Sequence, residues 1–466
     1  MENQTPDKKR LYSVLAAAFL GWMFDGLEMG LFPLIARPSL QQMQATGGAV
    51  VSDAFVGQWM GYATAAFLIG AALGGVVFGW LGDRIGRVRA MSLSILCYSL
   101  FTGCLYFSTQ PWHLALFRFI AALGMGGEWS LGVALVMEVW PDKSRPLMAG
   151  LIGVASNVGF ASIAVVGLFF RVTVDSWRWV ALVGAAPALL TLGISFFVPE
   201  SEKWQHAVKS RDSRQDPLTE IFGSAWLLYC AALSGAVALH FFGGLSLWLC
   251  ALIGGLASAI IAFLPRKVKA DGPLVRKTLI GTALASVALI GTWGSVQWLP
   301  LWADKMTGGL EPTAKAYTQV SSALGAIAGC LLGAWVGGFI SRRMAYFLLC
   351  LGSLVSCAWL FRGFDSYSVS FLALTFLVGG LTAAFYGWLP LYLPELFPTR
   401  VRATGQGIGY NAGRVLAAVG ALQMGALMQT FHGSYAQAGA VITLVYAVGM
   451  VIIWIAPETK GKPLPE

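Results

Sequence analysis

Apolar runs of about twenty residues recur along almost the whole chain and are separated by short polar turns. An α-helix of that length crosses the hydrocarbon core of a bilayer, and no soluble core needs such a succession of them. The pattern therefore predicts an all-α polytopic membrane protein. Fourteen helices are expected, at residues 12–35, 55–81, 90–107, 112–140, 147–170, 179–198, 222–242, 245–264, 279–302, 317–339, 344–360, 369–391, 403–430 and 435–456.

The composition supports a membrane protein and changes how the net charge is interpreted. Hydrophobic residues make up 57% of the chain and charged residues 11%, with a mean hydropathy of +0.70. In a soluble protein, the formal charge of +9 would favour nucleic acid as a partner. With the N-terminus inside, about 23 of the 31 Lys and Arg residues fall in cytoplasmic segments, as the positive-inside rule requires. We therefore expect both termini in the cytoplasm, a lipid bilayer around the helices and no nucleic acid partner. The short loops favour a bacterial inner membrane.

Two motifs recur at matching places and indicate that the chain has two similar halves. The motif E-x-x-P-x-x-x-R begins at Glu138 and again at Glu395, and N-x-G begins at Asn157 and again at Asn411. Parallel halves of this kind place a solute site between them near the membrane midplane. The predicted organisation is an N-terminal six-helix half at 1–201, a cytoplasmic linker at 202–221, an inserted helical hairpin at 222–265, a second linker at 266–278 and a C-terminal six-helix half at 279–466.

The turn between the second and third predicted helices, residues 79–89, contains one acid and three arginines. A turn needs only a glycine and polar character, so charge of this density at the membrane boundary points to a function. A degraded copy at 337–343 keeps the glycine and the arginines, with Ser341 at the position expected for Asp83. The first turn reads G-x-x-x-D-R-x-G-R, with fixed positions Gly79, Asp83, Arg84, Gly86 and Arg87.

This motif resembles the loop between helices 2 and 3 of the major facilitator superfamily. The resemblance implies two halves that rock around a central solute site, so that the solute is carried by alternating access. It also implies that Asp83 and Arg87 hold the cytoplasmic side closed with the charges of the E-x-x-P-x-x-x-R loops. The expected gate residues are Gly79, Asp83, Arg84, Gly86, Arg87, Glu138, Arg145, Glu395 and Arg402.

Five charged residues fall at membrane depth within predicted helices, where an uncompensated charge costs several kcal/mol. Asp25 is near the middle of the first helix, and Glu28 lies on the same face about 5 Å further out. Paired carboxylates suit reversible protonation, whereas an arginine partner would make them structural. Arg118 reaches the level of Glu28, so an ion pair between these two helices is expected. Glu128, about 15 Å deeper than Arg118, either pairs with an arginine or takes the proton. Asp25, Glu28 and Glu128 are therefore the candidates for proton coupling.

The fifth of these residues, Arg414, is near the midplane and breaks the internal repeat, because its counterpart in the first half is Phe160. A guanidinium offers a planar fork for a carboxylate, which favours an anionic solute. The alternative is a lock with an intramembrane acid. The candidate substrate-binding residues are Arg414, Asn411, Gln297, Arg118 and Tyr386.

Other residues resemble particular symporters within this superfamily. Asp25-Gly26-Leu27-Glu28 is similar to the D-G-x-D signature of the sialate and aromatic-acid proton symporters, and Arg118 to Glu128 looks like their fourth helix. Fourteen helices with an inserted pair resemble the bacterial sialic acid transporters. The resemblance implies proton-coupled symport of a small organic anion by a monomer, with sialic acid the first choice. The alternatives are a lactate-like or aromatic monocarboxylate, or a neutral sugar. Two features depart from the pattern of these symporters. Glu28 stands where their signature has Asp, and Pro457-Glu458-Thr459 looks like the sugar porters.

An enzyme is a weaker interpretation, because catalysis needs a nucleophile with a base or a metal cluster. The histidines are scattered without ligand spacing, and the seven cysteines lie in apolar runs without a C-x-x-C pair. We expect no enzyme activity, no bound metal and no cofactor other than the coupling proton.

Overall fold

The computed structural model describes residues 8–47, 53–169, 172–209, 216–222, 272–308, 310–311, 313–432 and 434–466. These residues form helices and no strands. Ten of the described helices are long and apolar enough to span a membrane. The predicted hairpin at 222–265 lies outside the described residues from 223 onward, as does the first part of the linker at 266–278.

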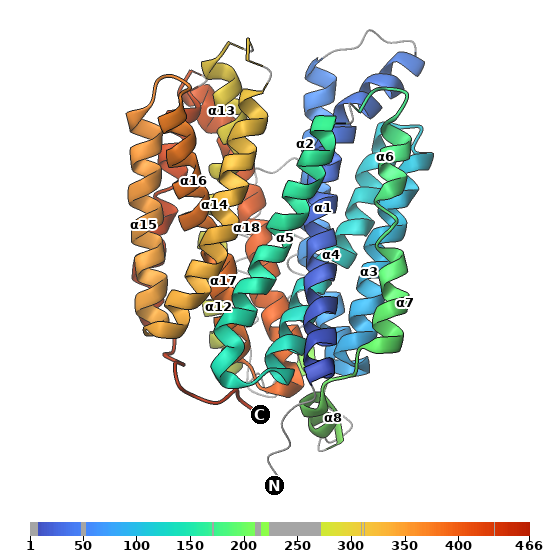
Figure 1. Ribbon diagram of the computed structural model, residues 1–466, viewed down its shortest axis with the longest axis vertical. Coiled ribbons are helices and arrows are strands. Elements are labelled where there is room, and N and C mark those ends of the chain that lie inside the picture. The colour runs from blue at the N-terminus through green and yellow to red at the C-terminus, as the bar shows by residue number, and fades with distance from the viewer. Residues whose placement is uncertain are drawn as a thin grey trace, which may run out of the picture.

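The helices form two groups that stand side by side with their axes roughly parallel (Figure 1). The first group comprises α1 (Lys8–Thr46), α2 (Asp53–Ile85), α3 (Arg87–Cys104), η1 (Leu105–Phe107), α4 (Pro111–Val139), η2 (Asp142–Ser144), α5 (Arg145–Phe169), α6 (Trp177–Val183) and α7 (Ala188–Phe197). The second comprises α12 (Gly272–Gly294), η4 (Val296–Trp298), α13 (Leu299–Met306), α14 (Ala314–Phe339), α15 (Arg342–Gly363), α16 (Val369–Ala383), α17 (Phe385–Tyr392), η5 (Leu393–Leu396), η6 (Thr399–Val401), α18 (Arg402–Thr430), α19 (Tyr435–Ile442), α20 (Val445–Ile452) and η7 (Ile453–Ile455). Two short helices, α8 (Glu202–Lys209) and α9 (Pro217–Phe222), lie in the first predicted linker.

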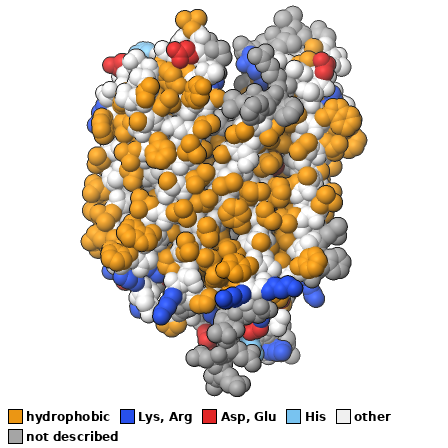
Figure 2. All heavy atoms as spheres, in the orientation of Figure 1, with side chains coloured by type: hydrophobic (Ala, Val, Ile, Leu, Met, Phe, Trp, Pro, Cys, Tyr) orange, Lys and Arg blue, Asp and Glu red, His pale blue; other side chains and the backbone are white. Residues whose placement is uncertain are grey.

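The two halves meet along two seams, where α2 packs against α18 and α5 packs against α14 and α17. The start of α1 and the C-terminus lie at the same end of the bundle, which we call the terminal end (Figure 1). Figure 2 shows a broad apolar band across the face in view and basic side chains gathered towards the terminal end. Exposed apolar side chains in such a band are suited to lipid and would be unstable in water.

Proline interrupts several of the predicted helices without ending the span. The run at 179–198 forms α6 and α7, joined by a tightened turn at Pro187, which has no N–H to give to an α-helical bond. Around this residue the backbone bonds are of the i→i−3 type, from Gly184 N to Ala181 O at 3.0 Å and from Leu190 N to Pro187 O at 2.9 Å. A similar break at Ser295, before Pro300, separates α12 from η4 and α13.

The first helix is longer than the apolar pattern predicted, ending at Thr46 and not near residue 35. Its extension continues past Pro38 because packing holds it, since Leu40 and Met43 are buried in one cluster with Trp177. At the start of the second half, α12 begins at Gly272, several residues before the expected 279.

One stripe of glycines has a clear packing role. A Cβ added to Gly325 or Gly329 on α14 would meet a carbonyl oxygen of α16, that of Phe376 or Gly380, closer than any real contact. Small residues of this kind allow two membrane helices to approach at backbone distance. The stripe therefore fixes α14 against α16 and with it one wall of the central cavity.

Candidate functional site

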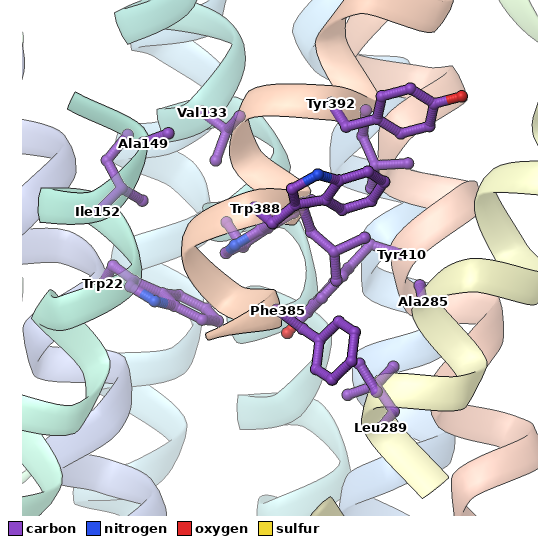
Figure 3. Packing of buried hydrophobic residues seen from close by; sticks show 14 of the residues in the cluster. Trp22, Val133, Ala149, Ile152, Ala285, Leu289, Phe385, Trp388, Tyr392 and Tyr410 are labelled. Carbon is purple, nitrogen blue, oxygen red and sulfur yellow. The ribbon is translucent and has the colours of Figure 1, made fainter. Parts of the chain in front are cut away.

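A cavity of about 230 Å³ lies between the two halves. Each half contributes aromatic side chains to its wall, and Figure 3 shows Trp22 of α1 in the same packed region as Tyr410, Phe385 and Trp388 of the second half. The aromatic lining residues are Trp22, Phe160, Trp293, Tyr386 and Tyr410, and the polar ones are Ser156, Asn157, Thr292, Gln297, Gln319, Ser322 and Thr382. Cavities that combine apolar walls with a few polar groups are typical of small-molecule sites.

Arg414 is the charged residue among those that line this cavity in the described part of the chain. It lies on α18 one turn after Tyr410, with its guanidinium carbon 5.5 Å from the centre of that ring. The side chain is only 4% exposed, and its Nη1 is buried without a hydrogen-bond partner among the described residues. A guanidinium with a free N–H group at this depth is costly unless an anion joins it.

Two other predicted binding residues, Gln297 and Tyr386, also line the cavity. The break at Ser295 carries the chain through the short helix η4, which contains Gln297. Tyr386 donates a hydrogen bond from its hydroxyl to Thr292 Oγ1 at 3.0 Å, so that α17 and α12 are joined across the wall. The tyrosine is thus fixed in orientation before any ligand arrives.

The remaining two, Asn411 and Arg118, do not line the cavity. The Asn411 amide donates to Gly126 O at 2.9 Å and to Gly407 O at 3.0 Å, which joins α18 to α4. Arg118 forms the ion pair expected with Glu28, and its guanidinium lies over the rings of Phe32 and Phe67 at 4.2 and 4.5 Å. Both side chains are engaged in contacts between helices.

Asp25 and Glu128 are buried, and all four of their carboxylate oxygens have no hydrogen-bond partner among the described residues. The two carboxylates interact electrostatically with each other, and Asp25 also feels the charge of Arg414. Glu128 Oε1 lies where a side chain on Gly21 would be, so this glycine makes room for it on α1. Two neighbouring buried carboxylates without partners cannot both be ionised at modest cost.

The sequence paired Asp25 with Glu28 from their helical spacing, and the structure adds a partner to each of them. Glu28 forms an ion pair with Arg118, and Asp25 interacts electrostatically with Glu128 as well as with Glu28. The ion pair compensates the charge of Glu28, whereas Asp25 and Glu128 have no such counter-ion pair among the described residues.

A second cluster of charges joins the two halves at the terminal end. Arg87 pairs with Asp83 at 2.7 Å and with Glu138 at 3.1 Å, and Glu138 also accepts from Arg402 at 2.9 Å. Asp83 reaches the first turn of α18, accepting from Thr404 N at 2.7 Å and Thr404 Oγ1 at 2.6 Å. A carboxylate at a helix N-terminus satisfies free N–H groups and the helix dipole. These bonds join α2 and α4 of one half to α18 of the other.

The structure also shows the surroundings of four other expected gate residues. Arg84 lies over the Trp80 ring at 4.8 Å and 3.7 Å from Asp216, and Arg145 Nε donates to Met137 O at 3.1 Å. Gly86 has a φ of 110°, a conformation that favours glycine. Gly79 lies against the backbone of Ala403 on α18.

The second half repeats this cluster in a register that differs from the one read in the sequence. Arg342 donates to Gly337 O and pairs with Glu395, as Arg87 donates to Gly82 O and pairs with Glu138. Ser341 is the N-cap of α15, the place that Gly86 has before α3. The match of Ser341 with Asp83 was therefore wrong by three residues. A spacing of glycine and arginine alone fits both registers, and only the hydrogen bonds distinguish them.

Sequence reasoning assigned no role to two acids that complete these clusters. Glu200 accepts from Arg87 N at 3.0 Å and Val88 N at 3.1 Å, and Glu458 accepts from Arg342 N and Arg343 N at 3.0 and 3.2 Å. Each acid therefore caps the helix that follows the charged turn. The recurring Pro-Glu-Ser/Thr triplet, at 199–201 and 457–459, was the signal for this role.

No group of three or more His, Cys, Asp or Glu residues in the described ranges is placed to hold a metal ion.

Comparisons with known proteins agree with this architecture. The family profile described as Major Facilitator Superfamily matches residues 14–421. The chain is 26% identical to the niacin transporter NiaP of Acinetobacter baylyi (98% of this chain and 97% of the relative are covered), and 25% identical to the sialic acid transporter NanX of Escherichia coli (98% and 95%). The fold is similar to that of the proton:xylose symporter XylE, with a TM-score of 0.73, 16% identity and 98% of each chain covered.

Proposed function

Because this chain belongs to the major facilitator superfamily, a family of multi-pass membrane transporters and not of enzymes, we propose that it carries a small organic anion by proton-coupled symport. The observation that carries the proposal is Arg414, a buried guanidinium with a free Nη1 in the wall of the central cavity. A carboxylate is the anion that matches the planar fork of arginine. Arg414 therefore binds the carboxylate of the substrate, and Gln297 and Tyr386 contact the rest of it.

The proton is carried by Asp25, with Glu128 beside it. Support comes from the absence of hydrogen-bond partners for their carboxylates among the described residues and from the interaction of Asp25 with Arg414. When a substrate anion neutralises Arg414, the attraction that favours the ionised form of Asp25 weakens, and proton uptake becomes easier. Glu28, by contrast, is engaged by Arg118 and serves structure.

Both termini lie in the cytoplasm of a bacterial inner membrane in this proposal. Support comes from the positive-inside rule, because basic side chains gather at the terminal end. In that orientation, the charge cluster of Asp83, Glu138 and Arg402 closes the cytoplasmic side. Alternating access then requires that these bonds between the halves break when the cavity opens inward.

The relatives support a carboxylate without selecting one acid. NiaP and NanX are equally distant from this chain, and their names refer to niacin and sialic acid, two different carboxylic acids. The first choice from the sequence, sialic acid, therefore has no advantage over an aromatic acid. The shared chemical group is the one that Arg414 fits, and the proposal is made for that class.

The test compares acids with their own amides, such as nicotinate with nicotinamide and lactate with lactamide. The wild type should prefer the acid. Arg414→Lys keeps the charge but loses the fork, so binding of the acid should weaken by about 1.5–3 kcal/mol. Arg414→Ala should weaken acid binding further and abolish the preference, whereas Tyr386→Phe, a control in the same wall, should retain it. Equal discrimination by wild type and Arg414→Ala would favour a neutral-sugar carrier with Arg414 as a structural lock.

A further inference from the structure

Phe160 and Arg414 occupy matching positions in the two halves and line the same cavity. Each is three residues after the asparagine of the N-x-G motif, Phe160 on α5 and Arg414 on α18. If the repeat were exact at this position, residue 160 would be a second cation at the cavity. Residue 160 is instead a phenylalanine, whose ring carries no charge.

In the described part of the chain, the wall around Phe160 offers no substitute for that cation. Its neighbours from the N-terminal half in the lining are Trp22, Met29, Gly153, Ser156 and Asn157, of which two are polar and none carries a positive charge. The acids Asp25, Glu28 and Glu128 lie on α1 and α4 of the same half, and Arg118 is already paired with Glu28. The N-terminal side of the cavity therefore favours an uncharged group and repels a negative one.

We propose that the cavity selects substrates with a single carboxylate, and that Phe160 sets this charge selectivity. The inference rests on the proposed function, in which Arg414 binds a carboxylate. A dicarboxylate would satisfy Arg414 with one end and bury the other near Phe160, where the described lining provides no second cation. A buried, unpaired carboxylate is among the costliest groups to accommodate.

Phe160 is also held in place, which makes it a wall and not a flexible lid. Its Cδ2 lies 3.2 Å from the position of a Cβ on Gly30, so the ring packs directly against the backbone of α1. A long basic side chain at residue 160 would start from the same place and face the same cavity. A basic substitution at residue 160 therefore adds a positive charge to the cavity and leaves Arg414 unchanged.

The test uses pairs of acids with one carbon skeleton. These are 2,4-hexadienoate and 2,4-hexadienedioate, and 4-methylbenzoate and terephthalate, with the monomethyl ester of each di-acid. The ester removes one charge without shortening the molecule. We expect wild type to bind the mono-acid and the half-ester at least about 100-fold more tightly than the di-acid, since tenfold corresponds to 1.4 kcal/mol. Binding is measured by thermal shift and by competition for uptake.

Two variants of Phe160 complete the experiment. Phe160→Arg should bring the di-acid to within about tenfold of the mono-acid, whereas Phe160→Leu, which keeps residue 160 apolar, should preserve the wild-type preference. If wild type binds the di-acid as well as the mono-acid, or binds no monocarboxylate, the inference is wrong. An unchanged preference in a folded Phe160→Arg protein would remove Phe160 from the role. Mono-acid binding that survives Arg414→Ala would refute the proposed function itself, independently of residue 160.

Discussion

The two arginines buried at membrane depth illustrate how the surroundings of a residue decide its role. Arg118 is compensated by Glu28 and by two aromatic rings, and its charge is not available to a ligand. Arg414 has one ring beside it and a free Nη1 at a cavity. Both are equally costly in hydrocarbon, so the difference in compensation indicates which of them receives an anion.

The same contrast between Asp25 and Glu28 gives a prediction about coupling. Asp25→Asn should abolish accumulation driven by a pH gradient while leaving substrate exchange across the membrane, because it removes a group that takes a proton but makes no hydrogen bond. Its Tm should change little. Uptake and counterflow in proteoliposomes measure the two activities.

Glu28→Gln is the matched control on the same helix face. It leaves the buried Arg118 without its counter-ion, so it should lower the free energy of unfolding by about 3–5 kcal/mol. Glu128→Gln should affect coupling like Asp25→Asn if the two acids share the proton. Gradient-driven accumulation that persists in the Asp25 variant would exclude Asp25 from proton transfer.

Among the elements, the helices that follow the charged turns show how the repeat is built. Glu200 caps α3 and Glu458 caps α15, and each lies beside a hydroxyl donor, Ser201 or Thr459, that bonds the acid of the E-x-x-P-x-x-x-R motif. Each cap comes from the end of its own half, so it holds that end against the start of α3 or α15. The Pro-Glu-Ser/Thr triplets therefore have a structural role.

The Glu458 cap predicts a pH dependence of stability. Burial alone would raise the pKa of Glu458, but backbone N–H groups of Lys460, Arg342, Arg343 and Thr459 bond its carboxylate and lower the pKa below the usual value. A lowered pKa in the folded state gives stability that is present above the unfolded pKa and lost as the pH falls through the folded one. Glu458→Gln should lower Tm at pH 7 and reduce the loss of Tm between pH 7 and about 4.

Glu311→Gln, at an exposed position, is the control for this prediction. It should leave the slope of Tm against pH unchanged. An identical slope in wild type and Glu458→Gln would show that the cap carries no pH-dependent stability.

At the scale of the whole molecule, the two seams between the halves are related by the repeat but are not equivalent. The seam of α2 and α18 has the charged lock of Asp83 on the first turn of α18. At the other seam, the register of the second turn puts Gly338 in the place of Asp83, and it packs against Pro146. Asp83 therefore has no acidic counterpart at position 338.

This asymmetry predicts the effect of Asp83→Asn. The variant loses the ion pair with Arg87 and weakens the bonds to Ala403 N and Thr404 N, so the closed terminal end should open more often. Transport should slow more than substrate affinity falls, and the amides of the first turn of α18 should exchange hydrogen faster. Uptake rates, Kd and hydrogen–deuterium exchange measure the three effects.

Ser341→Ala tests the corrected register, because Ser341 bonds only within the start of its own helix. It should leave exchange at α18 unchanged. If Asp83→Asn instead destroys affinity at normal turnover, Asp83 does not belong to a gate.

The sequence by itself determined the helical membrane fold, the two-half repeat and three buried charges, namely Arg414 and the pair of Arg118 with Glu28. These features follow from local physics, since hydrocarbon requires long apolar helices and makes every buried charge conspicuous. Only the tertiary structure decided the partners: Asn411 with Gly126, Asp25 with Glu128, and the register of the second charged turn. A helix that is apolar on all sides does not indicate which face meets which neighbour. Its rotation and depth are set by packing between helices distant in the sequence, and these fix which polar groups meet.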